Sequence, residues 1–254
     1  MEIQGKTILI TGGTAGIGLE AAKQFLANSA KVIITGRDQS KLDKAKQLYP
    51  ALIAIKSDAG NADDAQLLFN QIKELGGIDI LYNNAGVLSM STNMGVANDR
   101  HSKEAEHEMN VNYFGVIRLN NLFMEMLKSR KESAIINTTS ILSYVPSALE
   151  ATYSASKVAL HFYTETLRKH LEIINSHIKV FELLPPVVAT NMTAGRNDKK
   201  ITPEKVVKTL IAGLKKQQFT IRVGDTKLLY LVNRLFPKMA FGLVNSDKNI
   251  KQLQ

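Results

Sequence analysis

Short apolar runs alternate with amphipathic segments along most of the chain. The runs are rich in Ile, Val and Leu and occupy residues 6–11, 31–36, 51–58, 78–84 and 134–139. They are continuously apolar rather than alternating, which is typical of strands buried on both faces. Segments with helical periodicity lie between them, at 16–29, 38–48, 61–75 and 102–128, and another begins after residue 152. This alternation predicts a parallel sheet.

The remainder of the chain continues the same pattern. Residues 177–184 and 218–224 predict a sixth and a seventh strand. Between them Thr202 and Pro203 stand where a helix N-cap and first helical residue belong. We therefore predict an α/β doubly wound Rossmann fold, with a seven-stranded parallel sheet and helices on both faces. One domain, 1–254, would end in a basic amphipathic segment, 226–254, whose helix Pro237 should break.

Composition narrows the class of protein. The 254 residues include 44% hydrophobic residues and no Cys, so we expect no disulfide and no thiolate metal site. No apolar run reaches about 18 residues, and the start shows no leader pattern. We predict a cytoplasmic protein without a metal.

The net charge of +9 is concentrated at one end. Residues 196–254 hold 13 Lys and Arg against 4 Asp and Glu, which accounts for all of it. A solvated basic face explains this, and so does contact with an anionic surface. We predict no nucleic-acid partner and no stable membrane insertion, although peripheral membrane contact stays open.

A glycine-rich turn follows the first strand. Residues 11–18 read TGGTAGIG, with Gly12, Gly16 and Gly18 between the strand and the next helix. Such a turn lets backbone approach a pyrophosphate, and the helix N-terminus offers free N–H groups to it. Plain tight turns also use glycine, but strand before and helix after is the context that dinucleotide binding requires.

The end of the second strand indicates which dinucleotide is bound. An NAD site usually has an acidic residue there, which binds the ribose 2′-hydroxyl. This chain has Gly36 at that place, followed by Arg37. A guanidinium suits a 2′-phosphate, so we predict NADP(H). Asp38 is interpreted as the N-cap of the next helix.

Tyr153 and Lys157 form a candidate proton donor and acceptor. They stand four residues apart in a helical segment, which places both side chains on one face. A Tyr hydroxyl has a pKa near 10, and a neighbouring ammonium favours the phenolate. Ser140 follows an apolar strand and can hydrogen-bond a substrate oxygen. Tyr144, four residues later, is a weaker candidate for substrate contact.

These motifs, in this order, resemble those of the short-chain dehydrogenase/reductase family, from Lys6 to about Met192. The thirteen-residue gap from Ser140 to Tyr153, the NNAG motif at 83–86 and Asn112 are part of the likeness. The resemblance implies a cofactor site made of Gly12, Thr14, Gly16, Ile17, Gly18, Arg37, Asp58, Ala59, Asn84, Ala85, Gly86, Tyr153, Lys157, Pro185, Val188 and Thr190.

The resemblance also implies catalytic roles for four residues. Tyr153 would exchange the proton, Lys157 would lower its pKa and bind the nicotinamide ribose, and Ser140 would polarise the carbonyl. Asn112 would hold a water that links Lys157 to solvent. One departure is Pro186, where the family usually has Gly, which predicts a stiffer loop. With TGRD at 35–38, this double proline is loosely similar to the subgroup found beside D-alanylation operons.

The function we predict is an NADPH-dependent carbonyl reductase that acts reversibly on a small-molecule ketone or aldehyde. An alternative is a reductase of lipid-like or cell-envelope substrates at a membrane surface. A non-catalytic NADPH-sensing module is a further alternative, disfavoured because Tyr153 and Lys157 are both present. The resemblance implies a homo-oligomer formed through the helices beginning near Ser102 and Thr152, and the unusual C-terminal segment favours a dimer over a tetramer.

Overall fold

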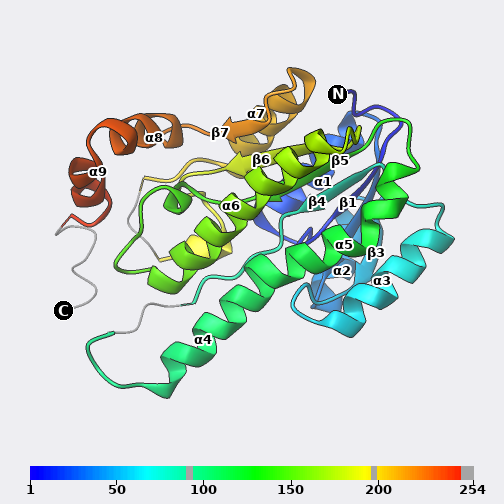
Figure 1. Ribbon diagram of the computed structural model, residues 1–254. Helices are drawn as coiled ribbons and strands as arrows, with labels where there is room; N and C mark the ends of the chain where they lie inside the picture. Colours follow the sequence, from blue (N-terminus) through cyan, green and yellow to red (C-terminus); the bar gives the residue numbers. More distant parts are fainter. Residues whose placement is uncertain (90–93, 196–198, 247–254) are drawn as a thin grey trace.

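Seven parallel strands form one sheet in the order β3-β2-β1-β4-β5-β6-β7 (Figure 1). The computed structural model describes residues 1–89, 94–195 and 199–246. The strands in that part of the chain are β1 (Thr7–Ile10), β2 (Lys31–Gly36), β3 (Ile53–Lys56), β4 (Ile80–Asn83), β5 (Ala134–Thr138), β6 (Lys179–Leu184) and β7 (Thr220–Arg222). The predicted doubly wound Rossmann fold is confirmed, and its strand order reverses between β1 and β4.

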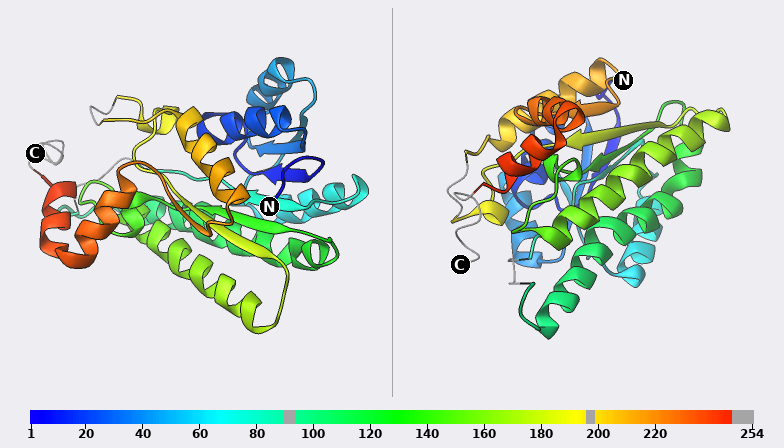
Figure 2. Two further views of the ribbon diagram at one scale, coloured as in Figure 1. Left: turned by 90° about the horizontal axis from the view of Figure 1, so that it is seen from above. Right: turned by 60° about the vertical axis from the view of Figure 1, so that its left-hand side comes forward.

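Both faces of the sheet are covered by helices (Figure 2). The layer on one face contains α1 (Gly16–Ala27), α2 (Gln39–Leu48) and α7 (Pro203–Lys215). The other layer contains α3 (Ala62–Glu74), α5 (Gly115–Lys128) and α6 (Ala151–Ile173), and α4 (Asp99–Met109) packs on α6. Within β1, Ile8 and Ile10 enter the first core and Leu9 the second. This double burial explains the continuously apolar strands.

The predicted single helix 102–128 is partly wrong. The helix begins earlier, because Asn98 caps α4 by accepting a hydrogen bond from the backbone N–H of Arg100. It is then interrupted by a π-helical turn, Asn110–Phe114, before α5 begins. A π turn inserts one extra residue into a helix and often marks a functional position. Asn112 lies in this turn.

The C-terminal helices lie past the edge strand β7 (Figure 1). They are α8 (Thr226–Leu235) and α9 (Pro237–Val244), and Pro237 breaks the helix between them as predicted. Leu229 and Ala240 pack there against Val145, which belongs to the loop after β5. Residues 247–254 of the predicted C-terminal segment lie outside the described part of the chain. No helix in the described ranges combines the length and apolarity needed to cross a bilayer.

Candidate active site

The glycine-rich turn after β1 is packed too tightly for side chains. Gly12 and Gly16 have φ of +65° and +55°, a conformation that favours glycine. A Cβ on Gly18 would lie 2.2 Å from the carbonyl oxygen of Gly12. Ala15 at the N-cap of α1 supplies no side-chain cap to the first helical N–H groups. A backbone cradle beside an uncapped helix N-terminus fits the pyrophosphate of a nicotinamide dinucleotide.

The segment after β4 is bonded to this turn. The Thr11 hydroxyl oxygen accepts from the backbone N–H groups of Asn84 and Ala85 at 3.1 and 3.0 Å. The Asn84 amide donates back to the carbonyls of Thr11 and Gly12 at 3.1 and 3.2 Å. The carboxyl ends of β1 and β4 are thus tied together at the point where the strand order reverses, which is where doubly wound sheets bind their ligands.

Lys157 is buried at the base of a cavity that lies at the carboxyl ends of the central strands. Its side chain is 3% exposed, and its Nζ donates to the Thr138 carbonyl at 3.0 Å and lies 5.6 Å from the centre of the Tyr153 ring. Burial lowers the pKa of Lys157 to about 8, although the charge of Glu108 opposes this. The ammonium therefore still predominates at neutral pH, beside the tyrosine whose phenolate it would stabilise.

Ser140 and Tyr153 both line this cavity. Ser140 is buried at the end of β5, where its Oγ accepts from the backbone N–H of Leu142 at 3.1 Å and starts a short 3₁₀ turn, Ile141–Ser143. The Ser143 hydroxyl donates to the Lys157 carbonyl at 3.0 Å. The loop that carries Ser140 is therefore fixed to α6, the helix that carries Tyr153 and Lys157.

Asn112 is held by protein groups in the π turn. Its Oδ1 accepts from the backbone N–H of Val87 at 2.8 Å, and its Nδ2 donates to the Val87 carbonyl and to Ser156 Oγ at 2.9 and 3.0 Å. It clamps the segment after β4 onto α6. The predicted role in holding a water stays a prediction, while the observed geometry is that of a positioning residue.

The cavity above these residues has a volume of about 1220 Å³. The predicted site residues that line it come from the turns after β1, β4, β5 and β6 and from α6: Gly12, Gly16, Ile17, Asn84, Ala85, Gly86, Ser140, Tyr153, Lys157, Pro185, Val188 and Thr190. Apolar side chains from two C-terminal helices line its outer part: Leu228, Leu229, Val232, Leu243 and Val244. The two C-terminal helices therefore form part of the cavity wall.

The remaining predicted residues do not line the cavity. Gly18 and Asn112 lie behind it. Thr14, Arg37, Asp58 and Ala59 lie at the carboxyl ends of β1, β2 and β3, where the adenosine half of a dinucleotide would extend. Arg37 is exposed.

Asp38 has the predicted capping role. Its carboxylate accepts from the backbone N–H of Lys41 at 3.3 Å and from the Ser40 hydroxyl at 2.8 Å. The hydrogen bond from Ser40, followed by that from Lys41, lowers the pKa of Asp38. Since its carboxylate is engaged at the start of α2, Asp38 is accounted for without a role in binding a ribose.

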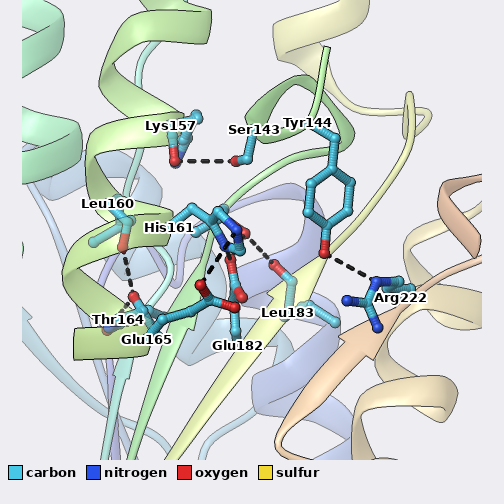
Figure 3. Close-up of polar contacts among 12 residues, drawn as sticks. Ser143, Tyr144, Lys157, Leu160, His161, Thr164, Glu165, Glu182, Leu183 and Arg222 are labelled. Atoms are coloured by element: carbon cyan, nitrogen blue, oxygen red, sulfur yellow. Dashed lines mark hydrogen bonds and ion pairs between the residues drawn. The ribbon is translucent and has the colours of Figure 1, made fainter. Parts of the chain in front are cut away.

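A buried polar network, which sequence reasoning missed, supports the site from behind (Figure 3). Glu182 on β6 is fully buried, and its Oε1 accepts from the Thr139 hydroxyl at 2.6 Å and contacts His161 Nδ1 at 2.8 Å. Thr139 precedes Ser140, and His161 lies one helical turn after Lys157. One carboxylate therefore ties together the strand and the helix that carry the candidate catalytic side chains.

Tyr144 belongs to this network rather than to the cavity wall. Its hydroxyl accepts from Arg222 Nε at 2.9 Å, its carbonyl accepts from Asn233 Nδ2 at 3.0 Å, and its ring packs edge-on against His161 (Figure 3). The Arg222 guanidinium lies 3.8 Å from the centre of the Tyr230 ring. The predicted contact of Tyr144 with substrate has no support in this geometry, because Tyr144 is not among the lining residues.

Comparison with known proteins identifies the family. The family model described as short chain dehydrogenase matches residues 6–201. The chain belongs to the short-chain dehydrogenase family. It is therefore an oxidoreductase of a family that uses nicotinamide dinucleotides. The similarity is not limited to the motifs, because the family model matches the chain continuously over residues 6–201.

Individual relatives agree with this assignment. The chain is 33% identical to the uncharacterized oxidoreductase DltE of Bacillus subtilis (strain 168), over 87% of this chain and 89% of that protein. It is 32% identical to a 3alpha-hydroxysteroid dehydrogenase of Mediterraneibacter gnavus, over 84% and 83%. The first of these supports the subgroup likeness that the double proline suggested.

Solved structures have the same fold. A short chain dehydrogenase of Burkholderia cenocepacia J2315 in complex with NADP matches with a TM-score of 0.85 and 26% identity, covering 96% of this chain and 99% of that one. A short chain dehydrogenase/reductase of Burkholderia phymatum in complex with NAD matches with a TM-score of 0.81 and 20% identity, covering 92% and 96%. Both cofactors occur among its structural neighbours.

Proposed function

We propose that this protein is an NADPH-dependent carbonyl reductase, which reduces a ketone or aldehyde to an alcohol and can run in reverse. The observation that carries the proposal is the arrangement at one cavity of Ser140, Tyr153 and a buried Lys157 whose ammonium is held by the Thr138 carbonyl. These groups can orient a carbonyl, give it a proton and stabilise the phenolate that remains.

Each side chain at the site has a separate role in the proposed reaction. The dinucleotide supplies the hydride that reduces the carbonyl carbon. Ser140 donates a hydrogen bond to the carbonyl oxygen and increases the positive character of the carbon. Tyr153 transfers its hydroxyl proton to that oxygen, so that one hydride and one proton convert the carbonyl to an alcohol. The Lys157 ammonium stabilises the tyrosinate, and the Thr138 carbonyl keeps the ammonium in place.

The preference for NADP(H) rests on the end of β2. Arg37 is exposed where a 2′-phosphate would lie, and Gly36 stands where NAD-binding members usually have an acid. Asp38, the acid closest to this place in sequence, has its carboxylate engaged in capping α2. The NADP complex of the Burkholderia cenocepacia relative supports the proposal, and the NAD complex of the Burkholderia phymatum neighbour, at 20% identity, bears on the fold alone.

The cavity favours a bulky apolar substrate. Leu, Val and Met side chains of the loop after β6 and of α8 and α9 line much of the cavity away from Ser140 and Tyr153, together with a few polar groups such as Lys199 and Asp225. A similar relative is named as a dehydrogenase of a hydroxysteroid, which is a bulky apolar alcohol. This supports a ketone with a large apolar body over a small hydrophilic one.

We also propose that the protein is cytoplasmic and forms a dimer. A dimer through the helices that follow Asn98 and Glu150 is supported by two exposed aromatic side chains on them, Phe114 at 50% and Phe162 at 64%. The non-catalytic sensor remains the alternative from another class, and it is disfavoured because a sensor has no need of a buried lysine beside a tyrosine.

Replacement of the tyrosine tests the proposed function. Tyr153→Phe removes the proton donor, and kcat should fall by at least about 2–3 orders of magnitude, the usual size of an acid–base contribution. Tyr163→Phe is the matched control, because it removes a hydroxyl from the same helix that contacts Asn120 at 3.4 Å instead of lining the cavity. It should keep wild-type kcat. Near-normal turnover by Tyr153→Phe would overturn the assignment.

A further inference from the structure

The two C-terminal helices carry their apolar side chains on the outside. Large apolar side chains of α8, α9 and the residue between them are 51% to 68% exposed, among them Leu228, Leu231, Leu235, Phe236, Met239 and Phe241. Leu228, Leu231 and Leu235 follow one another at helical spacing, so they form a single stripe along α8. We call these six residues the α8–α9 apolar face. Single exposed apolar residues are common on protein surfaces, but several grouped on neighbouring helices indicate an interaction site.

Positive charges flank this face. Residues 226–246 contain Lys227, Arg234 and Lys238 and no Asp or Glu. All three basic residues are exposed. Lys227 and Arg234 lie seven residues apart on α8, beside the leucine stripe. Apolar side chains bordered by lysine and arginine on a short helix are typical of helices that lie in the interface of an anionic bilayer.

The apolar face continues into the cavity. Leu228 is 65% exposed and also lines the cavity, together with the more buried Leu229 and Val232. In Figure 2 the two helices lie together at one end of the molecule, past the sheet edge. Apolar surface therefore extends from the outside of α8 inward along the wall of the cavity that holds Ser140 and Tyr153.

We propose that the α8–α9 apolar face docks on the surface of an anionic lipid bilayer, with the mouth of the cavity at the bilayer. Docking means lying on the surface, because α8 and α9 are 10 and 8 residues long and Pro237 separates them. The proposal concerns an interaction surface and holds whichever carbonyl compound the site reduces.

Charge favours a bilayer over a second copy of the chain. A two-fold contact would press this face against itself and bring its three basic side chains near their own counterparts, with no acidic residue of the segment to pair with them. Anionic headgroups supply the missing negative charge and acyl chains bury the leucines.

Sedimentation of the whole chain with lipid vesicles tests the proposal. Vesicles of mixed phosphatidylcholine and phosphatidylglycerol should pellet the protein, pure phosphatidylcholine vesicles should bind it more weakly, and added salt should weaken binding. The double variant Leu231→Asp, Leu235→Asp should lose at least about tenfold in partitioning. Neither leucine lines the cavity, so reduced-nicotinamide binding should stay unchanged.

The chain offers a closely matched control. Leu48 and Leu67 are 66% and 58% exposed, against 68% and 54% for Leu235 and Leu231, and they lie on α2 and α3. The double variant Leu48→Asp, Leu67→Asp adds the same charge and should bind vesicles like the wild type. Equal loss in both double variants, or wild-type protein that stays in the supernatant at low salt, would overturn the proposal.

A second copy of the chain is the other occupant that the experiment can reveal. Sedimentation velocity on the same variants detects it. If the double variant Leu231→Asp, Leu235→Asp dissociates an oligomer and the wild type does not bind vesicles, the face is a subunit interface and the bilayer proposal is wrong. If the oligomeric state is unchanged and only vesicle binding is lost, the proposal stands.

Discussion

Removal of the buried Glu182 carboxylate should be among the most destabilising single changes in the protein. The side chain is fully buried and joins Thr139 on one side to His161 on the other. Glu182→Ala leaves both partners without this acceptor inside the protein. Breaking a buried charged pair in this way costs about 3–5 kcal/mol of folding free energy. At about 2–4 °C per kcal/mol for a domain of this size, we expect the melting temperature to fall by at least about 6 °C.

The loss of folding stability on replacing Glu182 should depend on pH, in a direction set by the pKa of His161. Burial lowers the pKa of His161, but the hydrogen bond and charge of Glu182, and then the charge of Glu165, outweigh it and raise the pKa overall. A raised histidine pKa means that protonation stabilises the folded state. This contribution is complete below the ordinary histidine pKa of about 6.5 and is lost as pH rises through the raised value.

The variant Glu182→Gln measures the contribution of the negative charge of Glu182 separately from that of its hydrogen bonds. The glutamine keeps an acceptor for Thr139 and His161, so the difference in unfolding free energy between the wild type and this variant should grow from about pH 8.5 to about pH 5.5. Chemical denaturation at these two pH values measures it. The matched control is Glu165→Gln, which removes a carboxylate 3.9 Å from the same histidine but 51% exposed, and should cost under about 1 kcal/mol.

Two outcomes would refute this reasoning. If Glu182→Ala costs no more than Glu165→Gln, the buried carboxylate does not hold the strand and the helix together. If the cost of Glu182→Gln is the same at both pH values, the charge of His161 is not coupled to Glu182.

Three further changes test the cofactor site and its supports. Arg37→Ala should raise the KM for NADPH by about 10–100-fold, the size of one charge-assisted contact, and leave the KM for NADH unchanged; equal effects on both would contradict the role. Gly18→Ala should lower NADPH affinity at least about tenfold in a fluorescence titration, because its Cβ would lie 2.2 Å from the Gly12 carbonyl oxygen; wild-type affinity would show that the turn can move. Asn112→Ala removes three hydrogen bonds and should lower the unfolding free energy by about 2–4 kcal/mol in denaturant titrations, and a loss below about 1 kcal/mol would argue against the clamp.

The sheet could be predicted from the sequence because each strand is buried on both faces. Residues such as Ile8, Leu9 and Ile10 must all be apolar when helices cover both sides, and this leaves an unmistakable run. The glycine turn and the Tyr153–Lys157 spacing were equally readable, because their chemistry depends on short distances along the chain. Local caps at Asp38 and Thr202 were predicted for the same reason, and both are present.

The parts that were missed depend on contacts between distant segments. The π turn at Asn112 forms where that side chain reaches the backbone of Val87, which no helical periodicity reveals. His161 has no partner close to it in the sequence, because Glu182 lies 21 residues away on a strand. Glu182 did leave one signal, a carboxylate in the middle of the apolar run KVFELL, and a buried acid in a central strand calls for a partner.

The proposed reaction is tested most directly by following the hydride itself. NADPH in which both hydrogens on the reactive nicotinamide carbon are replaced by deuterium is incubated with the protein and a panel of apolar ketones and aldehydes, and the products are analysed by mass spectrometry. We predict an alcohol with one deuterium on the former carbonyl carbon, formed by the wild type and by Tyr163→Phe and lost in Tyr153→Phe. Tight NADPH binding with no deuterated alcohol from any carbonyl compound would contradict the reductase and favour the sensor.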